Sequence, residues 1–142
     1  MRESASSVTG RQLAIVVMAI VVLAGAYFAA RRIMQPPTQA PADAGRASAD
    51  EFLKLVHDGQ AGLAWDSATS EFKSIEGRES FIRKVKATAI LREPFSFSSM
   101  QQVAVHDSPR SEVLYTSSKS GGTVRVLIGY EGGDWRVDRL TH

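Results

Sequence analysis

The chain has 142 residues, a formal net charge of +2 and no cysteine, which excludes a disulfide framework, a thiol nucleophile and a cysteine metal site. From Ile33 onward, 13 Lys and Arg face 14 Asp and Glu, so this part carries a net charge of −1. It therefore lacks the positive footprint of a nucleic-acid-binding protein.

An uncharged apolar run of 18 residues, Leu13 to Ala30, lies between Arg11 and the pair Arg31 and Arg32. A helix rises about 1.5 Å per residue, so the run matches the ~30 Å hydrocarbon core of a bilayer. We therefore predict a short tail over residues 1–12 and a transmembrane helix over residues 13–30 that contacts membrane lipid.

A cleaved signal peptide is the alternative interpretation, because Ala24, Gly25 and Ala26 are small enough to form a cleavage site. The apolar character continues past them, and Tyr27 and Phe28 lie where interfacial aromatic anchors are found. These features favour an uncleaved anchor.

Residues 31–47 are rich in proline and alanine, which is typical of an extended linker. The positive charges on the two sides of the apolar run are nearly balanced, so the linker decides our expectation of orientation. We expect it to hold a domain, residues 48–142, on the outer side of a bacterial inner membrane.

Three helices are predicted at the start of this domain. Ser48 and Glu51 have the spacing of a capping box, and Asp58-Gly59 ends the helix that follows. Apolar residues at helical spacing predict a second helix over residues 62–72 and a third over residues 77–88.

After Pro94 the apolar period changes to two, which predicts strands. The first covers residues 95–106, with a break near Ser98 and Ser99, and three more lie within 112–117, 124–130 and 135–138. The fold class is α+β: three helices packed on one face of a curved antiparallel sheet. We expect Trp65 and Trp135 to be buried in the core.

The domain resembles the cone-shaped superfamily of nuclear transport factor two and ketosteroid isomerase, and within it the uncharacterised bacterial envelope branches. The likeness rests on loose motifs: FLKLV at 52–56, Asp58-Gly59, AWD at 64–66, SEFK at 70–73, Phe81 and GDWRV at 133–137. It implies a cystatin-like cone roll. Membrane-anchored members imply scaffolding roles in the envelope, and soluble members imply isomerases, dehydratases and cyclases that work inside the cone.

The strand positions predicted to face the core include no acid and no histidine, so we predict no catalytic residue and no enzyme. The histidines lack paired spacing, so we predict no metal site, and no cofactor is implied. If the cone holds a ligand, Trp65, Tyr115 and Tyr130 are the expected lining. A register slip of one residue would add His106.

The opposite face of the sheet suggests an interface. With a four-residue loop at 119–122, Leu114 lies opposite Leu127, and Leu140 lies diagonal to Leu127. These three leucines, with a charged rim that includes Arg125, predict self-association or docking of another envelope protein.

Two functions therefore stay open. The first is a non-catalytic interaction or scaffold domain on a membrane anchor. The second is a small-ligand-binding or weakly enzymatic cone, which requires a cavity of roughly 300 Å³ or more with a titratable group inside it.

Overall fold

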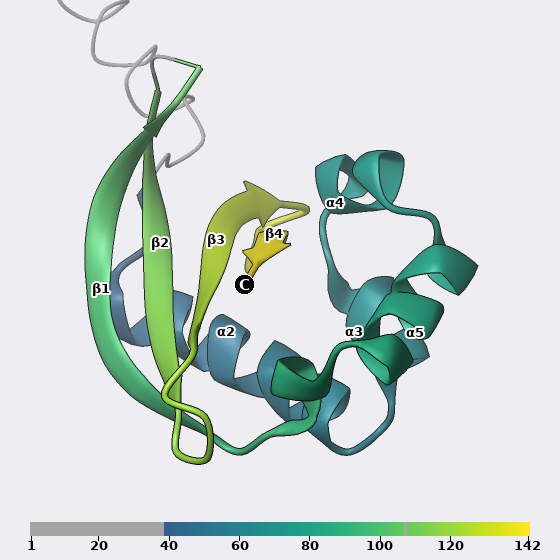
Figure 1. Cartoon of the computed structure of the whole chain (residues 1–142). Helices are drawn as coiled ribbons and strands as arrows, with labels where there is room; N and C mark the ends of the chain where they lie inside the picture. The colour runs from purple at the N-terminus through teal and green to yellow at the C-terminus, as the bar shows by residue number, and fades with distance from the viewer. Residues whose placement is uncertain (1–38, 107) are drawn as a thin grey trace, which may run out of the picture. The chain divides into compact units, whose positions relative to one another are not determined.

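The computed structural model describes residues 39–106 and 108–142, and these residues form an α+β domain with four α-helices and a four-stranded antiparallel sheet in the order β1-β2-β3-β4 (Figure 1). The elements in chain order are α2 (Ala42–His57), α3 (Ala61–Ser67), α4 (Ser70–Ile75), α5 (Arg78–Ala87), a 3₁₀ turn η1 (Ala89–Arg92), β1 (Phe95–Val105), β2 (Ser108–Ser117), β3 (Thr123–Glu131) and β4 (Asp134–Thr141).

Helix α2 begins at Ala42, so the predicted start at Ser48 is wrong, and residues 42–47 belong to a helix and not to an extended linker. The reason is tertiary. The N–H of Ala40 donates to Ser111 Oγ at 2.9 Å, and the buried Gly45 lies against Met100, so strands β1 and β2 hold this first turn. The hydroxyl of Ser48 donates to the Trp135 carbonyl at 2.6 Å and caps no helix.

The predicted second helix is two helices. Helix α3 ends at Ser67, and α4 begins at Ser70 after Thr69. Thr69 is the N-cap of α4, because its Oγ1 accepts the Phe72 N–H at 3.2 Å. The third predicted helix is confirmed as α5, between Gly77 and Thr88.

The strands lie where the two-residue period predicts them. A register shift between Phe97 and Ser99 confirms the predicted break in β1. Val113, Tyr115, Val124 and Val126 are buried, as expected of residues that face the helices.

The pairing of the later strands differs from the prediction. The last pair of β2 and β3 is Thr116 with Thr123, so Leu114 lies opposite Arg125 and not opposite Leu127. A bulge between Leu127 and Ile128 then places Leu140 opposite Val126. Because a one-residue shift turns a side chain to the other face of the sheet, Leu140 belongs to the core.

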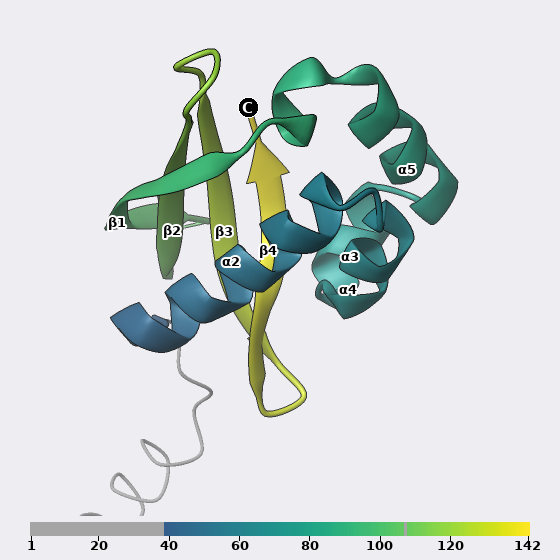
Figure 2. The ribbon, with the colours of Figure 1, turned by 90° about the horizontal axis from the view of Figure 1, so that it is seen from below.

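The core lies between α2 and the strands, and Figure 2 shows α2 crossing the face of the sheet. Phe52, Phe72 and Phe81 form its aromatic centre, with ring centroids 5.3–5.9 Å apart. Trp65 and Trp135 are only half-buried and pack at its margin, which corrects the expectation that both are buried core residues.

None of the helices in the described part of the chain combines the length and the apolar character needed to cross a bilayer. The predicted transmembrane segment, residues 13–30, lies outside the described residues.

Candidate functional site

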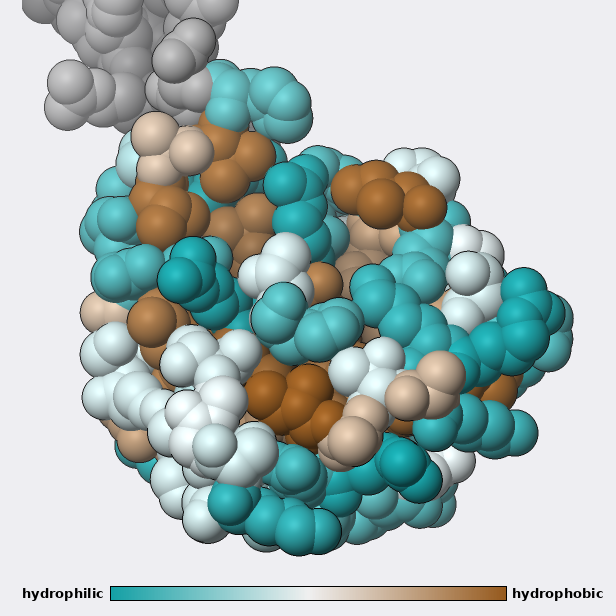
Figure 3. Space-filling model, in the orientation of Figure 1, coloured by the Kyte–Doolittle hydropathy of each residue, from teal (hydrophilic) through white to brown (hydrophobic). Residues whose placement is uncertain are grey.

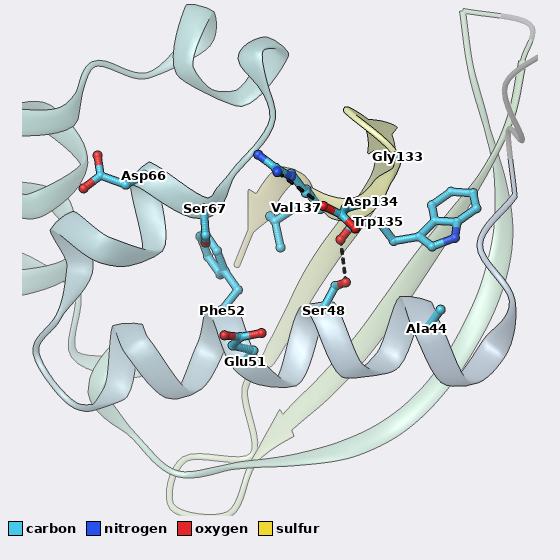
Figure 4. A pocket seen from close by; sticks show the side chains of 11 residues that line it. Ala44, Ser48, Glu51, Phe52, Asp66, Ser67, Gly133, Asp134, Trp135 and Val137 are labelled. Carbon is cyan, nitrogen blue, oxygen red and sulfur yellow. Dashed lines mark hydrogen bonds and ion pairs between the residues drawn. The ribbon is translucent and has the colours of Figure 1, made fainter.

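A groove in the described part of the chain has a volume of about 640 Å³ and lies between α2, α3 and the start of β4 (Figure 4). We call it the α2–β4 groove. Its lining is Ala44, Ser48, Glu51, Phe52, Asp66, Ser67 and residues 133–137.

One hydrogen bond joins β4 to α2, and one contact between aromatic rings joins β4 to β3. The hydroxyl of Ser48, on α2, donates to the main-chain carbonyl of Trp135. The Trp135 ring packs on Tyr130 of β3 with a centroid distance of 5.0 Å. The groove is therefore bounded by a helix and a strand that this hydrogen bond joins, and β3 supports the strand from its other side.

The groove is predominantly acidic. Three of its side chains are exposed carboxylates, Glu51, Asp66 and Asp134, and a single arginine, Arg136, lines it. Arg136 pairs with Asp134 at 3.5 Å, and Arg78 pairs with Asp66 at 3.3 Å. Glu51 forms no ion pair with any described residue.

The free edge of β4 is covered by the helices at two points. Gly132 and Gly133 form the turn between the paired residues Glu131 and Asp134, so the main chain of Trp135 and of Val137 faces away from β3. The Ser48 hydroxyl donates to the Trp135 carbonyl, and the N–H of Thr69 donates to the Val137 carbonyl at 3.0 Å. These contacts disfavour the addition of a further strand to β4.

The four residues predicted to line one ligand cavity are not brought together. Trp65, at the margin of the core, donates from Nε1 to the Glu76 carbonyl at 2.7 Å. Tyr130 stacks on Trp135 at the α2–β4 groove without lining it. His106 is exposed in the turn after β1 with φ +48. The structure places these side chains apart, and whether any of them binds a ligand stays a prediction.

Tyr115, the fourth residue, is buried on β2, and its hydroxyl donates to Asp50 Oδ1 at 2.6 Å. Burial raises the pKa of the Tyr115 hydroxyl above its usual value, and the hydrogen bond to Asp50 raises it further. Asp50 also pairs with Arg46 at 3.4 Å, and Arg46 lies 4.4 Å over the Phe97 ring. This arrangement ties α2 to β1 and β2, and we assign it a structural role.

The predicted patch of three leucines does not form on the outer face of the sheet. Leu140 is buried in the core, and Leu127 is only 5% exposed, opposite Glu112 and Arg139. A small groove of about 210 Å³ lies there, lined by Leu127 with Val103, Val105, Glu112 and Arg139 among others. Leu114 is half-buried beside Arg125.

Hydrophobic side chains on the view in Figure 3 form separate patches surrounded by polar residues. The large exposed apolar side chains in the described part of the chain are Leu63, Ile75 and Phe97. They lie on α3, α4 and β1 and do not make one extended surface.

The acids of the α2–β4 groove have no sequence signature as a site. Glu51 falls in a predicted capping box, Asp66 lies on a helix, and Asp134 follows a glycine turn. Each is typical of an exposed residue, and only the packing of α2 against both α3 and β4 places the three along one groove.

No cluster of three or more His, Asp or Glu among the described residues is placed to hold a metal ion. No protein-family model matches the chain, and no curated protein matches it.

Proposed function

We propose that the chain is a single-pass membrane protein that presents a non-catalytic protein-interaction domain on the outer side of the membrane. The observation that carries the proposal is the α2–β4 groove, which is open and is lined by exposed carboxylates. An active site usually holds an acid or base whose proton affinity is shifted because the group is withdrawn from water. Glu51, Asp66 and Asp134 lie in water, where they suit recognition of a partner.

The charge of the groove indicates the partner segment. With three carboxylates and one arginine on its walls, the groove complements an extended segment that carries lysine or arginine. Half-buried Trp135 supplies an aromatic surface of the kind that is enriched at protein interfaces.

A photo-crosslinking experiment on the full chain in its membrane tests the proposal. A benzophenone side chain at Ser67, in the groove, should give a discrete adduct, whereas one at the exposed Thr123 should give none. Glu51→Lys/Asp134→Lys should abolish the Ser67 adduct. The control Asp58→Lys/Glu79→Lys makes the same change of charge outside the groove and should preserve it. Loss of the adduct in both double variants, or in neither, would contradict the proposal.

The membrane anchor is proposed from the uncharged run at residues 13–30, and the cone-shaped roll from the helix-first order and the curved open sheet. Protease added to intact spheroplasts should digest the domain and leave the anchor. Digestion only after lysis would place the domain on the cytoplasmic side.

Self-association is supported by the other edge of the sheet. Strand β1 is an edge strand of 11 residues without a charged residue or a proline, and most of its side chains are exposed. Exposed edges usually carry charge or proline, which prevents pairing with another strand. We therefore propose that a second copy of the chain pairs along β1.

Binding of a small ligand is the second candidate. It is favoured by the volume of the α2–β4 groove, which falls in the range of about 300–1,000 Å³ that is typical of ligand pockets. The exposed, charged lining favours the interaction domain instead, because ligand pockets are predominantly apolar.

A further inference from the structure

A second groove, separate from the α2–β4 groove, has a volume of about 390 Å³ and lies where the end of α2, the start of α3, α5 and η1 meet. We call it the cationic groove. Its lining is Val56, His57, Gly59, Ala61, Gly62, Arg78, Ile82, Val85, Lys86 and Arg92.

Basic side chains reach the cationic groove from three elements: His57 from α2, Arg78 and Lys86 from α5, and Arg92 from η1. No carboxylate lines it. Lys86 and Arg92 are exposed and form no ion pair with any described residue. Lys86 and Arg92 are therefore cations that no described carboxylate neutralises, and a bound anion would pair with them.

Arg78 is held in place at the rim. Its Nε lies 3.3 Å from Asp66 Oδ1, and its Nη1 lies 3.7 Å from Glu79 Oε1. Its Nη2 lies so close to Gly62 that a Cβ atom at position 62 would be 2.5 Å away. Glycine at this position therefore leaves room for the guanidinium beside the backbone, and both residues line the groove.

The other part of the groove is apolar. Val56 and Val85 are buried in the core, and the half-buried Ile82 packs against that core and lines the groove. A solvated basic helix face would have no such wall, because its cations would project into water away from the core.

We propose that the cationic groove binds a small amphipathic anion, in which a carboxylate or phosphate group is attached to an apolar body. The anionic group lies among Lys86, Arg92 and Arg78, and the apolar body lies against Ile82 and Val85. This proposal does not depend on the proposed interaction of the α2–β4 groove.

Calorimetric titration of the full chain, held in phosphatidylcholine nanodiscs, tests the proposal with three probes. Phenyl phosphate combines an anion and an apolar ring, inorganic phosphate has only the anion, and phenol has only the ring. We expect phenyl phosphate to bind about tenfold or more tightly than either of the other two. Equal affinity for phenyl phosphate and inorganic phosphate, or no binding, would overturn the proposal.

Variants locate the site. Lys86→Gln/Arg92→Gln should weaken phenyl phosphate binding by about tenfold or more. The matched control Arg83→Gln/Arg125→Gln removes two exposed cations elsewhere and should leave binding unchanged. Ile82→Ala should weaken the binding of phenyl phosphate and not that of inorganic phosphate. Thermal unfolding of each variant shows that it is folded, and an equal loss in the control pair would overturn the assignment.

A competition arm distinguishes the sources of such an anion. If soluble short-chain phosphatidylglycerol displaces phenyl phosphate, a lipid headgroup with its glyceride body is the class of ligand. If it does not, the site takes a free aromatic or acyl anion.

Discussion

The hydroxyl of Thr69 donates a 2.8 Å hydrogen bond to Oδ1 of Asp138, a buried carboxylate on β4. Oγ1 of Thr69 also accepts the N–H of Phe72 and so caps α4, while the N–H of Thr69 donates to the Val137 carbonyl. One side chain therefore begins a helix and supplies a hydrogen-bond donor to a buried carboxyl group on the edge strand.

Thr69→Val should lower the free energy of unfolding by about 2–3 kcal/mol, because it removes a helix cap and leaves the Asp138 carboxylate without its donor. Chemical denaturation of the full chain measures the change. Thr69→Ser keeps the hydroxyl and should cost much less. If valine and serine cost the same, the hydroxyl contributes nothing, and the loss comes from packing.

Gly129 leaves space for the buried carboxylate of Asp138. A Cβ atom at position 129 would lie 2.9 Å from Oδ1 and 3.1 Å from Cγ of Asp138. Gly129→Ala should therefore destabilise the domain by about 1–3 kcal/mol through overpacking. The cost should be smaller when alanine is introduced into an Asp138→Ala background, because the clashing group is absent. Equal costs in the two backgrounds would contradict this explanation.

The sequence predicts the existence and order of the elements well, because the apolar period changes from helical spacing to alternation after Pro94. The break in β1 at Ser98 was predictable for the same reason. The residues at which helices start and end are harder to predict from the sequence. Pro41 and Ala42 begin α2 because of contacts with β1 and β2, which no local pattern encodes.

Register was the weakest part of the prediction. The loop between β2 and β3 holds six residues outside the pairing and not four, because Thr116 is the last residue paired with β3. Hydrogen bonds from the Ser117 and Ser120 hydroxyls to Glu93 hold this loop. The bulge after Leu127 has no glycine signal at its own position, yet it decides that Leu140 is a core residue.

The candidate grooves could not be predicted from spacing alone. Their charged side chains come from segments far apart in the chain, such as Glu51 with Asp134, or His57 with Arg92. Each of these residues is ordinary in its own element. Only the packing of α2 against β4 and η1 makes them neighbours.

Glu93 should make the acid stability of the domain depend on the β2–β3 loop. Hydrogen bonds from Ser117 and Ser120 lower the pKa of the Glu93 carboxyl. When the pKa of a carboxyl group is lower in the folded than in the unfolded chain, the group stabilises the fold at pH values above its unfolded pKa, which is about 4.3 for glutamate. This stabilisation disappears as the pH falls through the folded-state pKa. The difference in Tm between the wild type and Glu93→Gln should therefore shrink as the medium is acidified below about pH 5.

The double variant Ser117→Ala/Ser120→Ala is the control for that experiment. It lacks both donors, so adding Glu93→Gln to it should change the acid profile little. A Tm difference between the wild type and Glu93→Gln that stays constant with pH would show that the carboxylate charge is not involved.

Gln102→Lys tests the proposed pairing of two chains along β1. Gln102 is exposed at the middle of this uncharged edge, and a lysine there places like charges across the two-fold axis of a dimer. Sedimentation of the detergent-solubilised chain should change from dimer to monomer. Thr123→Lys, which adds the same charge on β3, should remain dimeric. A monomeric wild type at high concentration would refute the pairing.

Tyr115 should govern alkaline stability. Burial, with a contribution from the hydrogen bond to Asp50, raises the pKa of its hydroxyl in the folded state. The unfolded chain loses this proton near pH 10, so the stabilisation is complete below that pH and is lost progressively as the pH rises above it. Tyr115→Phe has no proton to lose, and the stability of this variant should fall less steeply between about pH 10 and 12.

At neutral pH the Tyr115→Phe variant should lose about 1–3 kcal/mol of stability, because the substitution removes the hydrogen bond to Asp50. Denaturant unfolding at a series of pH values measures both effects. Asp50→Asn, which keeps the tyrosine but removes the carboxylate charge, should retain most of the alkaline slope, because burial is the larger cause of the shift. Parallel pH profiles for the wild type and Tyr115→Phe would show that the Tyr115 hydroxyl titrates alike in the folded and unfolded states.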